Sequence, residues 1–375
     1  MQSTFRKLLL SLGVFIVVGG LCYAVGLFVR THRIYAIVKT GQSGWRGQLH
    51  QFSDDVGIAP VPGATGAQVL AFGPDVPTRW NDRGFRVPLD PPASPPRRPL
   101  VLALGCSFTY GFGCVAEDAW PYQLAQCLGG SEINAAVCSH GLAQMLVLGR
   151  RLIPEYRPDY VVVQYSTWLA DRALSPFAPL QIGRVPTPFF GRDSHGELVL
   201  SPPAYASRLF ALPIEHYRST ARGLADYLSF LLRVGAPLLA GDDAGLLAFR
   251  CRQIFGRVPR PANDRLATER LVYSELADLT TQAGGRMFVV VLGKDHVPVT
   301  CPLGSQAGFT VVNAHAALLD RLPARDESTY NLTFTHVRGD PPRSVDGHPN
   351  AAAQRLIADT LAAAIRAAPD AVPAQ

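Results

Sequence analysis

Two short stretches far apart in the chain hold residues that could act together in nucleophilic chemistry. Ser107 lies in GCSFTYG (105–111), and both Asp346 and His348 lie in SVDGHPN (344–350). A serine hydroxyl becomes a strong nucleophile when a histidine takes its proton, and a carboxylate can hold that histidine in the required tautomer. These residue types therefore predict acyl transfer by a Ser107–His348–Asp346 triad.

Elements that could position these residues follow an alternating pattern. LVLALG (100–105) is a short, continuous apolar run, which is typical of a strand buried on both faces. Strands alternating with helices predict a parallel sheet covered on both faces, with sites beyond the carboxyl ends of its strands. Ser107 follows the first strand directly. The other predicted strands are 132–137, 159–165, 287–293 and 309–314, and the predicted helices are 119–128, 141–153, 264–283 and 349–367.

Each half of this pattern also has an ordinary structural explanation. A serine after a strand is often a helix cap, and DGHP is common turn chemistry. The adjacent thiol of Cys106 would need an exposed, electropositive setting to be the nucleophile, so Ser107 is favoured. Thr109 stands where G-x-S-x-G requires glycine, and the sequence contains neither a phosphate-binding glycine motif opening a helix nor H-E-x-x-H.

Composition narrows the classes of partner. Hydrophobic residues make up 48% of the 375 residues and charged residues 17%, which favours a large folded core. The net charge of +6 is spread without a run of five or six like charges, so no nucleic-acid partner is expected. The seven cysteines form no CxxC and no histidine-spaced pair, so no metal site is predicted, and no cofactor motif is found.

The N-terminal region contains a candidate membrane segment. Residues 8–29 carry no charge and follow Arg6 and Lys7, and about 20 apolar residues suffice for a helix to cross a bilayer. A cleaved signal peptide is the alternative, although its apolar region is shorter and ends in a small-x-small site. We expect a single-pass anchor in the inner membrane and an extracytoplasmic C-terminal domain. Basic residues on both sides of the segment leave the positive-inside rule nearly balanced.

The rest of the chain divides by composition. A Pro-rich stretch, PPASPPRRP (91–99), predicts a stiff linker into the main domain. The segment 170–262 breaks the strand–helix alternation and is interpreted as an insertion or cap. The expected divisions are an N-terminal tail (1–7), the anchor (8–29), an irregular lead-in (30–98), the main domain (99–368) and a C-terminal tail (369–375).

Four blocks of the sequence resemble the SGNH (GDSL-type) hydrolase family. LALGCSFTYGFGCVAEDAWPYQLAQ resembles its first block, and DGHPNAAAQRLIADTL resembles its last block, which carries paired Asp and His. INAAVCSHGLAQ (133–144) and YRPDYVVVQYSTW (156–168) resemble the second and third blocks, and NDRGFRVP (81–88) resembles a segment that precedes the first block in bacterial members. The resemblance covers roughly 54–170 and 284–368. It implies a three-layer α/β/α domain around a doubly wound, mostly parallel, five-stranded flavodoxin-like sheet, with Ser107, His348 and Asp346 as nucleophile, base and acid.

The resemblance also implies an oxyanion hole, and here the sequence departs from the family. Family members combine the backbone N–H of the nucleophile with a second-block residue and a third-block Asn, because charge develops on the carbonyl oxygen during acyl transfer. Cys106 replaces the Asp before the nucleophile, and Trp168 stands where Asn is usual. Ser139, with Gly141 nearby, fits the second-block position. Replacement donors could come from Gln164, Ser166 or Arg172.

The sequence thus leaves several functions open. The first is a serine-dependent hydrolase of an acylated glycan, a lipid or a small ester. The same triad would serve an O-acyltransferase, whereas the departures at Cys106 and Trp168 favour a binding or scaffold protein with an impaired site. An unrelated α/β domain is the remaining alternative. A disulfide between Cys106 and Cys138 is a further hypothesis, and the oligomeric state is left open.

Overall fold

The centre of the molecule is a parallel sheet, seen in a computed structural model that describes residues 2–40, 44–70, 74–90, 96–180, 183–212, 223–304 and 308–368. The predicted tail 369–375 and most of the Pro-rich linker lie outside the described residues. The five parallel strands have the chain order 2-1-3-4-5, the doubly wound flavodoxin-like order. In space they are β8 (Ser131–Asn134), β7 (Leu100–Leu104), β9 (Tyr160–Tyr165), β15 (Arg286–Val291) and β16 (Phe309–Val312).

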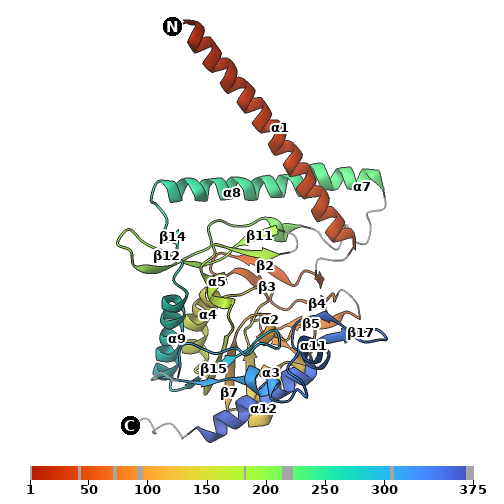
Figure 1. Ribbon diagram of the computed structural model, residues 1–375, viewed down its shortest axis with the longest axis vertical. Helices are drawn as coiled ribbons and strands as arrows, with labels where there is room; N and C mark the ends of the chain where they lie inside the picture. The colour runs from red at the N-terminus through yellow and green to blue at the C-terminus, as the bar shows by residue number, and fades with distance from the viewer. Residues whose placement is uncertain are drawn as a thin grey trace.

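Helices cover both faces of this sheet, which gives the three layers (Figure 1). The helices α3 (Trp120–Leu128), α10 (Ala314–Leu319) and α12 (Ala351–Ala367) pack together on one face. The other face is covered by α4 (Leu142–Tyr156) and α9 (Arg265–Gln282), with the short α5 (Leu169–Ala173) beside them. Strands β7, β9 and β15 are buried almost throughout, which explains their continuous apolar runs.

The sheet is wider than the five strands predicted. Four short strands from the lead-in extend it antiparallel from β8, so that it has nine strands among the described residues. The lead-in, which was expected to be irregular with short strands, thus adds strands to the edge of the sheet. The added strands are β6 (Arg86–Val87), β5 (Val76–Trp80), β4 (Thr65–Gln68) and β1 (Trp45–Arg46), and β2 (His50–Ser53) pairs with β3 (Gly57–Pro60) beside them.

The N-terminal helix α1 (Gln2–Thr40) is longer than the predicted anchor at both ends, so the short tail expected before it is helical from Gln2 onward. It is long and apolar enough to cross a membrane.

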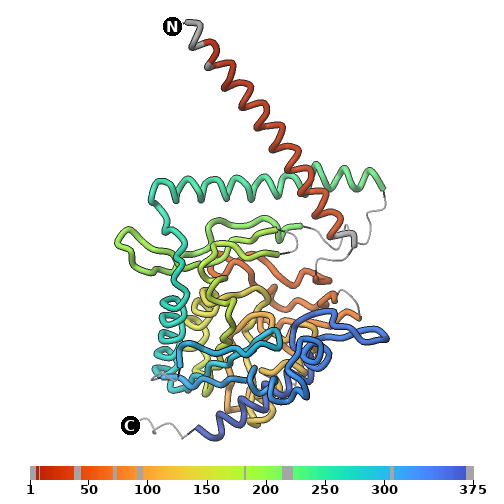
Figure 2. The backbone as a smooth tube through the Cα atoms, in the orientation of Figure 1, coloured from red at the N-terminus to blue at the C-terminus, as the bar shows by residue number. Residues whose placement is uncertain are grey.

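The segment 170–262 forms small sheets, β10 (Phe177–Leu180) with β11 (Gly183–Pro186), and β12 (Phe189–Arg192) with β13 (Leu198–Ser201) and β14 (Arg260–Pro261). The same segment contains the 3-10 turn η2 (Leu209–Ala211) and a long helical stretch, α7 (Leu224–Ser229), the π-helical turn η3 (Phe230–Gly235) and α8 (Ala236–Ile254). Figure 2 shows this stretch crossing α1 on one side of the sheet domain.

The carboxyl group of Glu132, on β8, is expected to make the stability depend on pH. Burial raises the pKa of Glu132 from 4.5 to about 7. Between these values the folded protein keeps a proton that the unfolded chain has released, so stability falls as pH rises from 4.5 to about 7 and this contribution then levels off. Glu132→Gln should therefore match wild type near pH 4 and exceed it near pH 8 in urea unfolding, as the linkage requires. A variant that gains nothing at the higher pH would contradict this role, with Glu117→Gln as the control.

Candidate active site

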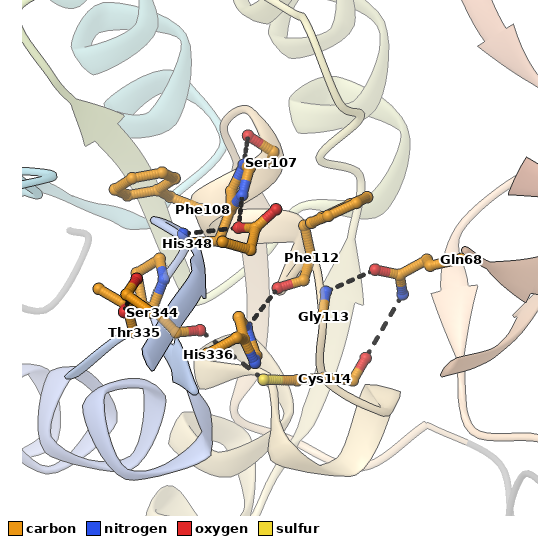
Figure 3. Close-up of polar contacts among 12 residues, drawn as sticks. Gln68, Ser107, Phe108, Phe112, Gly113, Cys114, Thr335, His336, Ser344 and His348 are labelled. Carbon is orange, nitrogen blue, oxygen red and sulfur yellow. Dashed lines mark hydrogen bonds and ion pairs between the residues drawn. The ribbon is translucent and has the colours of Figure 1, made fainter. Parts of the chain in front are cut away.

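The structure brings the three predicted residues into one hydrogen-bonded chain (Figure 3). Ser107 is the first residue of the short helix α2 (Ser107–Tyr110), directly after β7. Asp346 ends β18 (Arg343–Asp346), and His348 follows it before α12. The distance from His348 Nε2 to Ser107 Oγ is 2.9 Å, and that from His348 Nδ1 to Asp346 Oδ1 is 2.5 Å. The elements β17 (His336–Arg338) and α11 (Glu327–Phe334) support β18 from below.

The charges around the histidine set the direction of proton transfer. Burial tends to raise the pKa of Asp346, but hydrogen bonds from the imidazole and backbone N–H of His348, together with its charge, hold that pKa below its usual value. Asp346 is therefore a carboxylate at neutral pH and accepts the proton on His348 Nδ1. The lone pair on Nε2 then faces the hydroxyl of Ser107, which is the arrangement required of a general base.

Aromatic rings hold the imidazole in place. The ring centroids of Phe108 and Phe112 lie 5.2 and 4.7 Å from that of His348. Trp168 packs edge-on against Phe108 at 5.1 Å and has the ammonium of Lys294 5.9 Å from its ring. The residue predicted at the Asn position thus extends an aromatic wall beside the triad.

The turn that carries Ser107 rests on a buried polar group. Gln164 Oε1 accepts hydrogen bonds from the backbone N–H of Cys106 and from Thr109 Oγ1, at 3.0 and 2.8 Å. A Cβ at Gly105 would lie 2.1 Å from Thr109 Oγ1, so only glycine allows this close approach. Cys106 is fully buried, and its sulfur contacts Gln164 Nε2 at 3.2 Å. Its thiol packs beneath the turn, with the sulfur 3.9 Å from Ser107 Oγ.

The hypothesis of a disulfide between Cys106 and Cys138 is wrong for this structure. Both residues are free thiols, as are the other five cysteines. Burial raises the pKa of Cys138 well above its usual value. A thiol in such a setting stays protonated and behaves as a small apolar side chain.

The proposed oxyanion residues have unequal access to a ligand. The backbone N–H of Gly141 donates to Gln144 Oε1 at 3.0 Å, and that of His140 donates to Val137 O. Ser139 precedes both and lies in the left-handed region at φ 71°, which is uncommon for a residue other than glycine. Of the replacement donors, Ser166 Oγ donates to Leu292 O, Arg172 donates to His140 O, and Gln164 lies under the turn. Among the described residues, the backbone N–H groups of Ser107 and Ser139 have no such acceptor, so these two amides are candidate donors for a developing oxyanion.

The sequence analysis missed a set of contacts that fixes the loop after α2. The guanidinium of Arg86 donates to the carbonyls of Tyr110, Gly111 and Cys114 and lies 4.1 Å from the Tyr110 ring centroid. We call this set the Arg86 clamp. Arg86 is only 2% exposed, and among the described residues its guanidinium bonds to carbonyls and forms no ion pair with a carboxylate. The one feature of the sequence that could have indicated it is an arginine between two apolar residues in NDRGFRVP, shortly before β7.

Two further side chains fix the same loop from other directions. Gln68 Oε1 accepts from the backbone N–H of Gly113 at 2.6 Å. The ring of His336 reaches the loop from β17, and the distance from His336 Nε2 to Phe112 O is 3.2 Å (Figure 3). Burial lowers the pKa of His336. The turn η1 (Ala116–Asp118) follows the loop. Phe112, which packs against the imidazole of His348, is thereby positioned from both sides.

Two other histidine rings bond to backbone carbonyl oxygens outside the site. His140 Nε2 lies 2.8 Å from Ile58 O, and His315 Nε2 lies 2.9 Å from Val297 O. Burial lowers the pKa of His140 to about 4, so this side chain stays neutral. In the described part of the chain, no group of three His, Cys, Asp or Glu side chains could hold a metal ion.

Comparison with solved structures returns matches of low similarity. TesA has a TM-score of 0.31 and 11% identity over 70% of this chain and 95% of its own. A protein described as lipolytic and of the G-D-S-L family, from Desulfitobacterium hafniense, has a TM-score of 0.28 and 11% identity, covering 71% and 99%. A carbohydrate esterase family 2 enzyme from Corynascus thermopiles has a TM-score of 0.30 and 14% identity, covering 86% and 91%. No family model and no curated protein matches the sequence. At this level of similarity, the residues of the site carry the evidence for what the chain does.

Proposed function

We propose that the protein is a serine ester hydrolase in which Ser107 is the nucleophile, His348 the general base and Asp346 the residue that orients the base. The observation that supports this assignment is the continuous hydrogen-bonded chain from Asp346 through His348 to Ser107. It lies beyond the carboxyl end of β7, between that strand and β9, where the sheet changes winding direction. This is the part of a doubly wound fold where ligands bind.

The proposed reaction proceeds through an acyl-enzyme. His348 Nε2 takes the hydroxyl proton of Ser107 as Oγ attacks the ester carbonyl, and the resulting imidazolium is stabilised by Asp346. The imidazolium then gives its proton to the departing alkoxide, which leaves as an alcohol. Water attacks the acyl-enzyme with His348 again as base, and the carboxylic acid and free Ser107 result. The backbone N–H groups of Ser107 and Ser139 would stabilise the negative oxygen of both tetrahedral intermediates.

The substrate class we propose is an acylated glycan, a lipid or a small ester at the cell envelope. Support for this location comes from α1, whose exposed apolar side chains extend from Leu9 to Val29. A helix of this kind would act as a single-pass inner-membrane anchor, with the hydrolase domain on the extracytoplasmic side. An O-acyltransferase would use the same residues but would exclude water from the acyl-enzyme.

A fluorophosphonate probe tests the activated serine directly. The full-length protein in detergent should be labelled on the peptide that contains Ser107, and it should release p-nitrophenol from p-nitrophenyl acetate. His348→Ala should lose both signals while keeping its melting temperature. Absence of labelling in a folded wild-type protein would favour a non-catalytic binding protein. Transfer of the acetyl group to an added sugar, at the expense of hydrolysis, would identify an acyltransferase.

Replacing Asp346 by asparagine should affect turnover more than binding. Asparagine can donate to Nδ1 and would favour the wrong tautomer of His348, so kcat should fall roughly a hundred- to ten-thousand-fold with KM nearly unchanged. The measurement is steady-state hydrolysis of p-nitrophenyl acetate. Asp340→Asn, at an exposed position of the same hairpin, is the matched control and should behave as wild type. A full-strength Asp346→Asn enzyme would remove Asp346 from the mechanism.

A further inference from the structure

A second helix lies against α1 in an orientation suited to a membrane surface. The segments α7, η3 and α8 run without a break from Leu224 to Ile254, and we call them the transverse helix. The transverse helix crosses α1 at a steep angle instead of running beside it, on the side of the domain from which α1 projects (Figure 1). It is apolar and long enough to cross a membrane, as α1 is.

One face of the transverse helix is fixed to the hydrolase domain. Asp242 is buried and accepts from Ser207 Oγ and from the backbone N–H of Arg208, both at 2.7 Å. Phe249 is buried against the rings of Phe177 and Phe189. A helix crossing the bilayer would lose these contacts, which argues against a second membrane span.

Contacts between the two helices mark the level of the membrane boundary. The carboxylate of Asp243 accepts from both terminal nitrogens of Arg30, at 2.8 and 2.6 Å, and from Tyr23 Oη at 2.9 Å. Tyr35 packs on Phe230 with ring centroids 5.2 Å apart. These contacts begin at Tyr23, within the exposed apolar part of α1, and continue past its end at Val29; tyrosine and arginine are common at a membrane boundary.

The opposite face of the transverse helix is exposed, apolar and basic. It carries large side chains that no other described residue covers, namely Leu224, Leu228, Leu232, Leu247, Ile254 and Phe255, of which four are more than 70% exposed. Exposed arginines accompany them at 233 and 257, whereas Arg250 donates to Gln253 Oε1 and Arg252 to Ala204 O. The acidic residues of the transverse helix are turned away or paired: Asp242 is buried, Asp243 binds Arg30 and Asp226 is half-buried.

We propose that the transverse helix lies flat in the lipid headgroup layer and forms a second membrane contact beside α1. An interfacial helix combines an apolar face with arginine or lysine, because the first enters the boundary of the acyl chains and the second binds anionic headgroups. The proposal rests on α1 being the membrane anchor. Since one face is fixed to the domain and α1 projects from the other side, only the apolar and basic face meets the lipid.

This contact would also fix the position of the active site relative to the membrane. A single buried cluster joins Ile34 of α1 and Phe230 of the transverse helix to Tyr110, the last residue of α2, and to Val137, in the loop after β8. Because the cluster is continuous, the domain cannot rotate freely about α1. The esters within reach are then those carried by lipids or glycans at the membrane surface.

Spin labels on single cysteines test the depth of the transverse helix. The full-length protein, with Cys22→Ser and Cys251→Ser to remove the exposed thiols, is reconstituted in vesicles of phosphatidylcholine and phosphatidylglycerol. Labels are placed by Leu232→Cys, Leu247→Cys and Ile254→Cys. Leu332→Cys, an exposed leucine on α11, is the matched control, and Ile16→Cys reports on the anchor. We expect the ratio of oxygen to nickel-chelate accessibility to be several-fold higher at 232, 247 and 254 than at 332, and highest at 16.

The outcomes separate the two proposals. Aqueous values at 232, 247 and 254 with a deep label at 16 would overturn the interfacial helix and keep the anchor. An aqueous label at 16 would overturn the anchor itself and leave the chemistry of Ser107 untouched. A second membrane span would give the highest accessibility ratio at 247. The cysteines at 232 and 254 would then react with a membrane-impermeant thiol reagent from opposite sides of the membrane, and this result would also overturn the interfacial helix. Melting curves of each labelled variant confirm that the fold is kept.

Discussion

Replacing Ser107 with alanine should abolish ester hydrolysis, lowering kcat by roughly ten thousand- to a million-fold. The substitution removes the Oγ that lies 2.9 Å from His348 Nε2, so no acyl-enzyme can form. The oxyanion donors are backbone groups and stay in place, which leaves a small residual rate from binding and electrostatics. Hydrolysis of p-nitrophenyl acetate and fluorophosphonate labelling measure the effect. The melting temperature should remain close to that of wild type, because the alanine methyl fits where the serine Cβ lies.

The matched control for this experiment is Ser328→Ala, an exposed serine on α11. It should retain both activity and labelling. If Ser107→Ala still hydrolysed the ester and still reacted with the probe, mass analysis of the labelled peptide would identify a different nucleophile. Cys106 is unsuited to that role, because its thiol is fully buried under the turn.

The candidate residues that could be predicted were those with a recognisable pattern in their immediate sequence. Ser107 follows a continuous apolar run, which is the pattern of a strand buried on both faces. His348 and Asp346 lie two residues apart in the sequence. The predicted strands and helices of the main domain match β7, β9, β15, α3 and α9 within a few residues, because each has a run long enough to show its period. The order of the sheet then brings Ser107 and His348 together across 241 residues of chain.

The features that the sequence could not show depend on contacts between distant segments. Strands β1, β4, β5 and β6 are two to five residues long, too short for an alternating pattern, and they form only because the edge of β8 is available for pairing. The state of Cys106 is a further case, since nothing local distinguishes a thiol packed on Gln164 from half of a disulfide. The Arg86 clamp belongs to the same group, because its three acceptors lie 24 to 28 residues away.

Arg86→Ala is expected to be the most destabilising of the substitutions considered, by about 3–5 kcal/mol in the free energy of unfolding. The guanidinium is buried and donates to three carbonyls, of which Gly111 O also accepts from the backbone N–H of Cys114 and Cys114 O from Gln68 Nε2, and its loss opens a cavity beside Tyr110. Urea unfolding measures the effect. Arg83→Ala, in the same segment, is the matched control: Arg83 is 58% exposed and pairs with Glu155 on the surface, so its loss should cost at most about 1 kcal/mol.

A second variant shows whether the clamp also positions the site. Arg86→Lys keeps the charge, but its single ammonium cannot reproduce the fork that reaches Tyr110, Gly111 and Cys114 together. The loop should then loosen, and with it Phe112, whose ring packs 4.7 Å from that of His348. We expect kcat to fall at least about ten-fold at a temperature where the variant is fully folded, because small displacements of a catalytic base reduce turnover. Unchanged kcat in a folded but less stable Arg86→Lys enzyme would restrict Arg86 to a structural role, since the site would then keep its geometry without the clamp.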